Sequence, residues 1–211
     1  ILDAAANYLT RPPKRSDVLS VFAGLRPLAA PRSEGKKTKE ISRSHKLIRE
    51  KSGLITIIGG KWTTYRKMAQ DTLDLAIRYM HIPTKDCITE RYQIHGSRKN
   101  PDFSDPLYVY GTDADEIRNL VASSPAMAEK LHPDYAYTVG EVTWLVRNEM
   151  PRTLEDVLAR RLRILFLDAR AAMAMAPKVA GILATEWGKD ETWTSAQVKA
   201  FNEVASNYIL N

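Results

Sequence analysis

Residues 54–66, with the sequence LITIIGGKWTTYR, change character at Gly59 and Gly60. Before the glycines, five apolar or β-branched residues follow one another without alternation, which is typical of a strand buried on both faces, as in a parallel sheet. After them, apolar side chains recur at helical spacing. Adjacent glycines permit a positive φ and place no side chain between the backbone and a ligand. The stretch therefore predicts a strand, a tight turn and a helix whose start, beside Lys61, can hold negative charge, although the turn could also be a plain connection.

A connector rich in proline separates two parts of different character, since three of the 11 prolines and one glycine lie between residues 83 and 107. Before it, short apolar segments at 18–22, 40–48 and 54–58 predict strands, and a helix is expected to reach residue 80. After it, the pattern is helical almost throughout. We therefore predict an α+β protein, in which residues 1–86 form a small strand-and-helix domain and residues 87–211 form an all-α domain.

Capping residues give the expected helix starts in the second part. Thr153 is expected to begin a helix through Phe166, and the helix after Asp168 is expected to run to about Trp187. The side chains expected to cap helices are Thr112 or Asp113, Thr138, Thr153, Asp168 and Thr194.

The formal net charge of +6 is unevenly distributed. Residues 1–86 carry 17 Lys and Arg against 8 Asp and Glu, a balance of +9, whereas residues 87–211 carry 14 against 17, a balance of −3. A basic segment of this kind suits nucleic acid, an anionic membrane surface or a small phosphorylated substrate. It lacks a recognisable nucleic-acid motif and interleaved stacking aromatics, so nucleic acid is not expected as a partner.

The single cysteine, Cys87, excludes an internal disulfide framework and is expected to be an indifferent thiol. No apolar stretch approaches the roughly 18 to 20 residues that span a bilayer, and the first residues lack the order of a signal peptide. The histidines share no metal-ligand spacing, so no metal site is expected. Together these features predict a cytoplasmic protein.

Three segments, in order, carry a resemblance to a known family. The string GGKWTTYR at 59–66 resembles the flavin-contacting motif near the C-terminus of the FAD-dependent glycerol-3-phosphate dehydrogenases of the aerobic and mitochondrial type. The upstream segments VFAGLRPL at 21–28 and ISRSH at 41–45 look like the phosphate-binding and substrate-binding segments of that family. The helical half resembles, more loosely, the family's C-terminal cap domain.

The resemblance assigns roles to particular residues. It implies that the backbone around the glycine turn lines the flavin and that two arginines and a lysine bind the substrate phosphate. Lys61 and His45 are the candidate catalytic residues. His45 lies two residues from Arg43, and so on the same face of a strand, where it could orient the substrate or act as a base. In the flavin group are Gly59, Gly60, Lys61, Trp62, Thr63 and Thr64, and in the substrate group are Arg26, Arg43 and Lys61.

The implied activity is oxidation of sn-glycerol 3-phosphate to dihydroxyacetone phosphate by hydride transfer to FAD, with electrons passed to a quinone or another acceptor. The family is also compatible with a homodimer and with peripheral contact to the cytoplasmic membrane. The ten glycines never form the Gly-x-Gly-x-x-Gly pattern of a dinucleotide-binding start. We therefore expect a C-terminal part of a longer enzyme, inactive alone, with most of the FAD site upstream. Two alternatives remain: another flavoprotein oxidase of the amino-acid oxidase class, and a non-catalytic binding module with a basic surface.

Overall fold

The computed structural model describes residues 1–25 and 44–210. These residues form two compact units. One, here called the strand-helix unit, is Gly24–Ile94; the other, the helical unit, combines Ile1–Ala23 with His95–Asn211. The division thus differs from the boundary expected after residue 86, because the first 23 residues group with the helices and the connector up to residue 94 groups with the strands. The flavin and cap roles of the two parts stay predictions.

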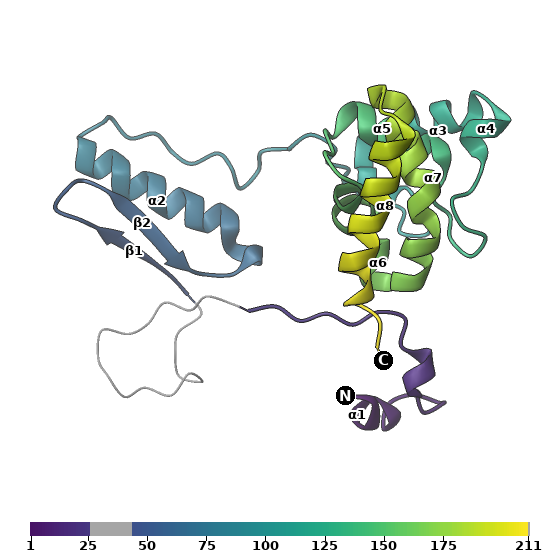
Figure 1. Cartoon of the computed structure of the whole chain (residues 1–211). Helices are drawn as coiled ribbons and strands as arrows, with labels where there is room; N and C mark the ends of the chain where they lie inside the picture. The colour runs from purple at the N-terminus through teal and green to yellow at the C-terminus, as the bar shows by residue number, and fades with distance from the viewer. Residues whose placement is uncertain (26–43, 211) are drawn as a thin grey trace. The chain divides into compact units, whose positions relative to one another are not determined.

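The strand-helix unit is a β-hairpin with a helix along it (Figure 1). Strand β1 (His45–Arg49) pairs in antiparallel fashion with β2 (Ile55–Gly59), and His45 lies opposite Gly59. The prediction of a parallel strand buried on both faces is wrong: within the described residues β2 pairs with β1 alone and all five of its residues are partly exposed. The short turn around Gly53, whose φ is 89°, reverses the chain and imposes the antiparallel pairing.

Helix α2 (Tyr65–Met80) follows β2 through the single 3₁₀ turn η3 (Trp62–Thr64), as the helical periodicity predicts. It ends at His81, which adopts the left-handed conformation with a φ of 53°. The guanidinium of Arg49 on β1 lies 3.3 Å from the ring centroid of Tyr79, so the strand and the last turn of the helix are joined by a cation–π contact. No residue of β1, β2 or α2 is fully buried.

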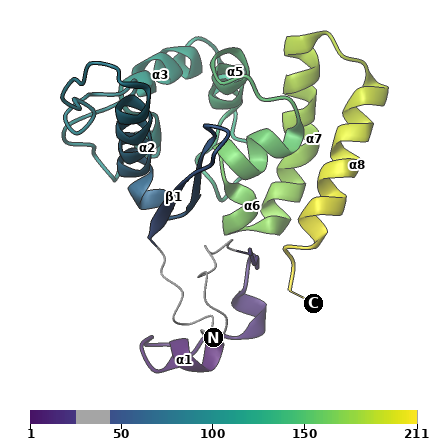
Figure 2. The ribbon, with the colours of Figure 1, turned by 90° about the vertical axis from the view of Figure 1, so that its left-hand side faces the viewer.

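The helical unit contains the hydrophobic core. Helices α7 and α8 lie side by side (Figure 2) and pack with α5, α6 and the preceding π-helical turn. None of the helices in the described ranges is long and apolar enough to cross a membrane. The helical segments of this unit are α1 (Leu2–Ala6), η1 (Arg15–Asp17), η4 (Tyr108–Asp113), α3 (Ala114–Ala122), α4 (Pro125–Ala128), α5 (Val139–Asn148), η5 (Asp156–Arg161), α6 (Ile164–Leu167), α7 (Ala169–Trp187) and α8 (Glu191–Ser206).

Three of the expected caps are confirmed in the structure, and one of them is Thr153, whose hydroxyl accepts a hydrogen bond from the Asp156 amide at 3.2 Å. The Thr138 hydroxyl accepts a hydrogen bond from the Glu141 amide at the start of α5, and the Asp168 carboxylate accepts one from the Ala171 amide at the start of α7. Each satisfies an amide that has no partner within its helix. Pro177 lies inside α7, which continues through it.

Two other helix predictions are wrong. The helix expected from Thr153 to Phe166 is interrupted at Arg163, where φ is 61°, and splits into η5 and α6. The last helix is capped by Asp190, whose carboxylate accepts from the Trp193 amide at 2.8 Å, rather than by Thr194. An acidic side chain at this position also interacts favourably with the positive end of the helix dipole.

Residues 18–22 form an extended segment against the helical unit instead of the expected strand. The Leu19 carbonyl accepts from the Ala169 amide at 3.1 Å, the Ser20 hydroxyl donates to the Leu165 carbonyl at 2.8 Å, and the Val21 amide donates to the Tyr208 carbonyl at 2.8 Å. The Phe22 ring meets the Phe166 ring edge-on, with centroids 5.0 Å apart. These contacts explain why the first residues belong to the helical unit.

A buried acid lies inside this unit. Glu141 is only 3% exposed, and its Oε1 accepts a hydrogen bond of 2.6 Å from the Tyr110 hydroxyl. Burial raises the pKa of Glu141 to about 7, because desolvation disfavours the carboxylate. The pKa of Tyr110 is raised as well, chiefly by its burial.

This pKa predicts a pH-dependent stability that Glu141→Gln removes. Between its ordinary pKa of 4.5 and about 7, the folded state holds a proton that the unfolded chain has released, so stability falls as the pH rises through this window. We expect the wild type to lose about 2 to 3 kcal/mol more than Glu141→Gln between about pH 4 and about pH 8. Urea unfolding across this range measures the difference. The exposed Glu203→Gln on α8 is the control, and an equal pH dependence for Glu141→Gln and the wild type would contradict the assignment.

Candidate functional site

Two glycines determine the backbone conformation of the turn that follows β2. The φ angles of Gly59 and Gly60 are 76° and 87°, a conformation that other residues rarely adopt. A Cβ on Gly60 would lie 2.5 Å from the Met68 sulfur of α2 and 3.3 Å from the His45 Cβ of β1. The missing side chain therefore lets the first strand and the helix approach the turn closely.

The residues after the turn combine a cation with exposed aromatic rings. The Thr64 hydroxyl donates to the Lys61 carbonyl at 3.0 Å, which closes the turn, while the Lys61 side chain stays exposed. Trp62 is 87% exposed and Tyr65 is 57% exposed, and their ring centroids lie 5.7 Å apart. An ammonium group, a helix start and two uncovered rings therefore lie within five consecutive residues.

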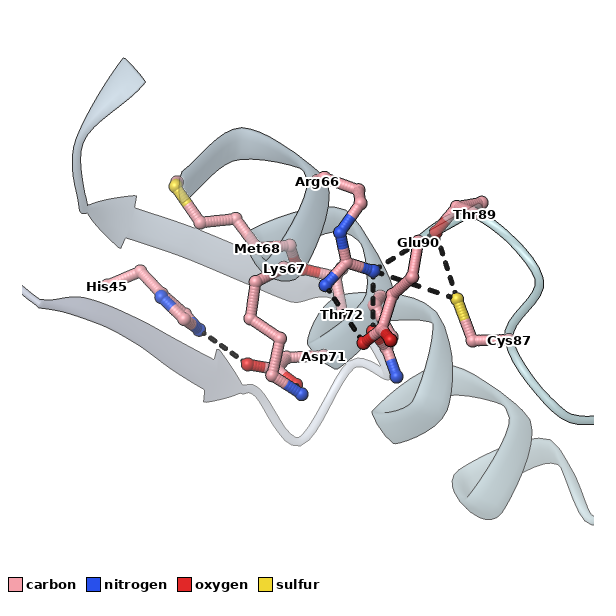
Figure 3. A network of polar contacts seen from close by, with 10 residues as sticks. His45, Arg66, Lys67, Met68, Asp71, Thr72, Cys87, Thr89 and Glu90 are labelled. Atoms are coloured by element: carbon pink, nitrogen blue, oxygen red, sulfur yellow. Dashed lines mark hydrogen bonds and ion pairs between the residues drawn. The ribbon is translucent and has the colours of Figure 1, made fainter. Parts of the chain in front are cut away.

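His45 makes a contact that the sequence analysis missed. Its Nε2 lies 2.9 Å from Oδ2 of Asp71 on α2, and the other carboxylate oxygen of Asp71 lies 2.9 Å from the Lys67 ammonium (Figure 3). The hydrogen bond from Lys67 is the main cause of the lowered pKa of Asp71, and the same bond raises the pKa of Lys67. Lys67 and Asp71 are four residues apart on a helix, a spacing that predicts an ion pair. Nothing in the sequence linked either residue to His45.

A hollow of about 280 Å³ adjoins the His45–Asp71 pair. Besides these two residues, it is lined by Leu47 of β1 and by Asp74 and Arg78 of α2. His45 and Asp71 therefore keep some access to solvent, with side chains 20% and 29% exposed.

A second polar network lies around Arg66 of α2 (Figure 3). Its guanidinium donates to the Gln70 side chain at 2.9 Å, to the Thr89 hydroxyl at 3.1 Å and to the Glu90 carboxylate at 3.4 Å. The Cys87 sulfur lies 3.0 Å from the Thr89 hydroxyl, and this hydrogen bond is the main cause of the lowered pKa of the exposed thiol. The network fastens the segment after α2 to the helix.

The predicted site residues fall into two groups. The structure brings His45, Gly59, Gly60 and Lys61 together around one turn, with Trp62, Thr63 and Thr64 directly after it. Arg26 and Arg43, which the resemblance assigns to the substrate, lie outside the described residues. In the described ranges, no three His, Cys, Asp or Glu side chains are grouped so that they could hold a metal ion.

Comparison with known proteins gives a consistent result. Residues 54–194 match the family described as the C-terminal domain of alpha-glycerophosphate oxidase. The chain is 33% identical to the mitochondrial glycerol-3-phosphate dehydrogenase SDP6 of Arabidopsis thaliana, over 98% of this chain and 40% of that protein. It is 35% identical to a probable mitochondrial glycerol-3-phosphate dehydrogenase of Caenorhabditis elegans and 31% identical to the mitochondrial enzyme of Mesocricetus auratus, each over 99% of this chain and 31% of the relative.

These names correct one expectation. The relatives are mitochondrial proteins by name, so the predicted cytoplasmic localisation is wrong. A single cysteine fits several compartments, and therefore could not identify the compartment. The chain spans about a third to two fifths of the length of the relatives it matches. The family resemblance carried by the three motifs is confirmed, and the chain belongs to the glycerol-3-phosphate dehydrogenase and glycerophosphate oxidase family, of which it is a C-terminal part.

Proposed function

We propose that the protein to which this chain belongs oxidises sn-glycerol 3-phosphate to dihydroxyacetone phosphate. The single observation that carries the proposal is the similarity over 98% of the chain to a protein named as a glycerol-3-phosphate dehydrogenase. The site around Gly59, Gly60 and Lys61 lies within this match. The relatives' names also favour a mitochondrial protein. A quinone as the onward electron acceptor and a homodimer as the assembly are part of the proposal and rest on the family resemblance alone.

The residues of the glycine turn fit an FAD cofactor. The positive φ angles of Gly59 and Gly60 present backbone rather than side chains at the surface, and Lys61 places a positive charge beside it. The exposed rings of Trp62 and Tyr65 supply apolar surface of the kind that a planar ring system covers. FAD would supply the acceptor for the hydride. The backbone of Gly59 to Thr64 would contact it, and Lys61 would stabilise negative charge on it or on the substrate.

The substrate is proposed to be held by its phosphate. Arg26, Arg43 and Lys61 together carry three positive charges, which suits a phosphate dianion, and arginine presents a fork of donors that matches phosphate oxygens. A substrate fixed at one end has its carbinol carbon oriented for transfer, and orientation is a large part of the rate. The excess of positive charge in residues 1–86 supports an anionic substrate.

His45 is proposed as the base. Oxidation of the secondary alcohol to the ketone removes a hydride from carbon and a proton from oxygen. FAD, when bound, would supply the hydride acceptor, and a nearby base would take the proton. Imidazole is suited to proton transfer near neutral pH. The position of His45 opposite Gly59, with its Cβ close to Gly60, supports this role.

The test is anaerobic flavin reduction by the protein expressed from its complete reading frame. Addition of glycerol 3-phosphate is expected to bleach the visible absorbance band of the oxidised flavin, whereas glycerol without the phosphate is expected to leave it largely unchanged. A yellow protein that glycerol 3-phosphate does not bleach would favour the amino-acid oxidase class. A colourless protein that retains labelled nucleic acid at physiological salt would favour the binding module.

A further inference from the structure

Asp71 is shared between a histidine of the strand and a lysine of its own helix. Oδ2 accepts from His45 at 2.9 Å and Oδ1 accepts from Lys67 at 2.9 Å (Figure 3). The carboxylate therefore has a fixed orientation, because each of its two oxygens has a separate partner. Asp71 lies 26 residues from His45 in the sequence, and the pairing exists only because α2 packs against the hairpin.

The charge of Asp71 determines which nitrogen of His45 carries a proton. Lys67 lowers the pKa of Asp71, so this side chain is a carboxylate at neutral pH and can only accept hydrogen bonds. A neutral imidazole that donates from Nε2 has its lone pair on Nδ1. The contact thus selects one of the two tautomers of His45, and Nδ1 becomes the nitrogen that can accept a proton.

We propose that Asp71 is a positioning residue for proton transfer, which holds the His45 ring and fixes its tautomer so that Nδ1 accepts the proton of the substrate hydroxyl. This inference rests on the proposed function, in which His45 is the base. In the step, the substrate O–H bond breaks, the proton forms a bond to Nδ1, and the hydride leaves the same carbinol carbon for the flavin. The imidazolium that results is stabilised by the carboxylate at Nε2.

A purely structural role for Asp71 makes different predictions. If the carboxylate only joined α2 to β1, its loss would lower stability and affect every property of the site together. A positioning role instead slows the proton-transfer step and leaves substrate affinity intact. The test must therefore separate the rate of flavin reduction from the apparent substrate dissociation constant.

The decisive variant is Asp71→Asn in the protein from the complete reading frame. The amide has the same shape, but it can donate as well as accept, so it permits both tautomers of His45. We expect anaerobic flavin reduction by glycerol 3-phosphate to slow by about 10- to 100-fold, with a dissociation constant changed by less than about threefold. The solvent deuterium isotope effect on reduction should rise, because proton transfer becomes slower relative to hydride transfer.

A matched control and a double variant make the test specific. Asp74→Asn removes a carboxylate from the same hollow and helix and is expected to reduce the flavin at nearly the wild-type rate. In a His45→Gln background, Asp71→Asn should add less than about a twofold further loss, because both residues act on one proton. Full additivity, or a wild-type rate and isotope effect for Asp71→Asn, would overturn the inference.

A spectroscopic readout does not depend on turnover. With histidine labelled by ¹⁵N in the chain, which contains 4 histidines, the His45→Gln variant identifies the His45 signals. Neutral His45 is expected to show the Nε2–H tautomer in the wild type and a mixture in Asp71→Asn. An Nδ1–H tautomer in the wild type would reject the inference and leave the proposed function standing. A wild-type holoprotein that glycerol 3-phosphate does not bleach would reject both.

Discussion

Replacement of Gly111 by alanine is expected to destabilise the helical unit by about 4 kcal/mol or more. Gly111 is buried and has φ 55° and ψ −118°, a combination that residues with a Cβ essentially do not adopt. An alanine Cβ would lie 1.6 Å from the Gly96 carbonyl oxygen and 2.7 Å from its carbon, and both atoms belong to backbone that cannot rotate away. The Thr112 amide donates to that same oxygen at 3.2 Å, so relief of the clash also breaks this hydrogen bond.

Urea unfolding followed by tryptophan fluorescence measures this effect, because three of the four tryptophans, Trp144, Trp187 and Trp193, lie in the helical unit. The control is Gly181→Ala within α7. A Cβ at Gly181 has no neighbour within 4 Å, and alanine in a helix is more stable than glycine by about 0.5 to 1 kcal/mol. Unfolding midpoints that are equal for Gly111→Ala and Gly181→Ala would show that the close approach of Gly111 to Gly96 is wrong.

Replacement of Lys61 by methionine is expected to slow flavin reduction by about 10²- to 10³-fold in the complete protein, about 3 to 4 kcal/mol in the barrier. Methionine keeps much of the length and apolar character of lysine and removes the charge that we propose for the flavin or the substrate phosphate. Lys61 lies on the surface and its side chain is exposed, so folding does not require the ammonium. The loss should therefore appear in turnover without a matching loss of stability.

Stopped-flow reduction with glycerol 3-phosphate, together with a thermal melt, checks both parts of this expectation. Lys46→Met is the matched control, because Lys46 is exposed on β1 and the strand alternation directs it away from the face of His45. Reduction by Lys61→Met at the rate of Lys46→Met would remove Lys61 from the site. A melt lowered along with the rate would indicate that the lysine supports the turn rather than the chemistry.

The parts of the fold that sequence reasoning predicted are those decided within a few residues. Thr138 and Asp168 cap their helices through contacts three residues away, and the glycine turn is followed by α2 because the periodicity of that helix is local. The interruption at Arg163 was missed because an arginine gives no sign of a positive φ, and the helix α6 that follows it packs on α7. Asp190 was passed over for Thr194 because both residues suit a cap and only the structure decides between them.

The candidate site, like the fold, was predicted only where its residues are close together in the sequence. Lys61 and the glycines could be read from a contiguous string, and a resemblance supplied their proposed roles. The role of Asp71 could not be predicted from the sequence, because its contact with His45 depends on how α2 packs against the hairpin. Its nearest signal, the pairing with Lys67 on one face of α2, is common on solvent-exposed helices and gave no reason to connect it with chemistry.

The extended segment at 18–22 has a consequence for synthesis of the chain. Its Val21 amide pairs with the Tyr208 carbonyl, and its Ser20 hydroxyl pairs with the Leu165 carbonyl. On the ribosome these residues emerge long before their partners, and the whole strand-helix unit is translated in the interval. These contacts therefore cannot form until Leu165 and Tyr208 have been translated, and the ring contact of Phe22 with Phe166 likewise waits for α6.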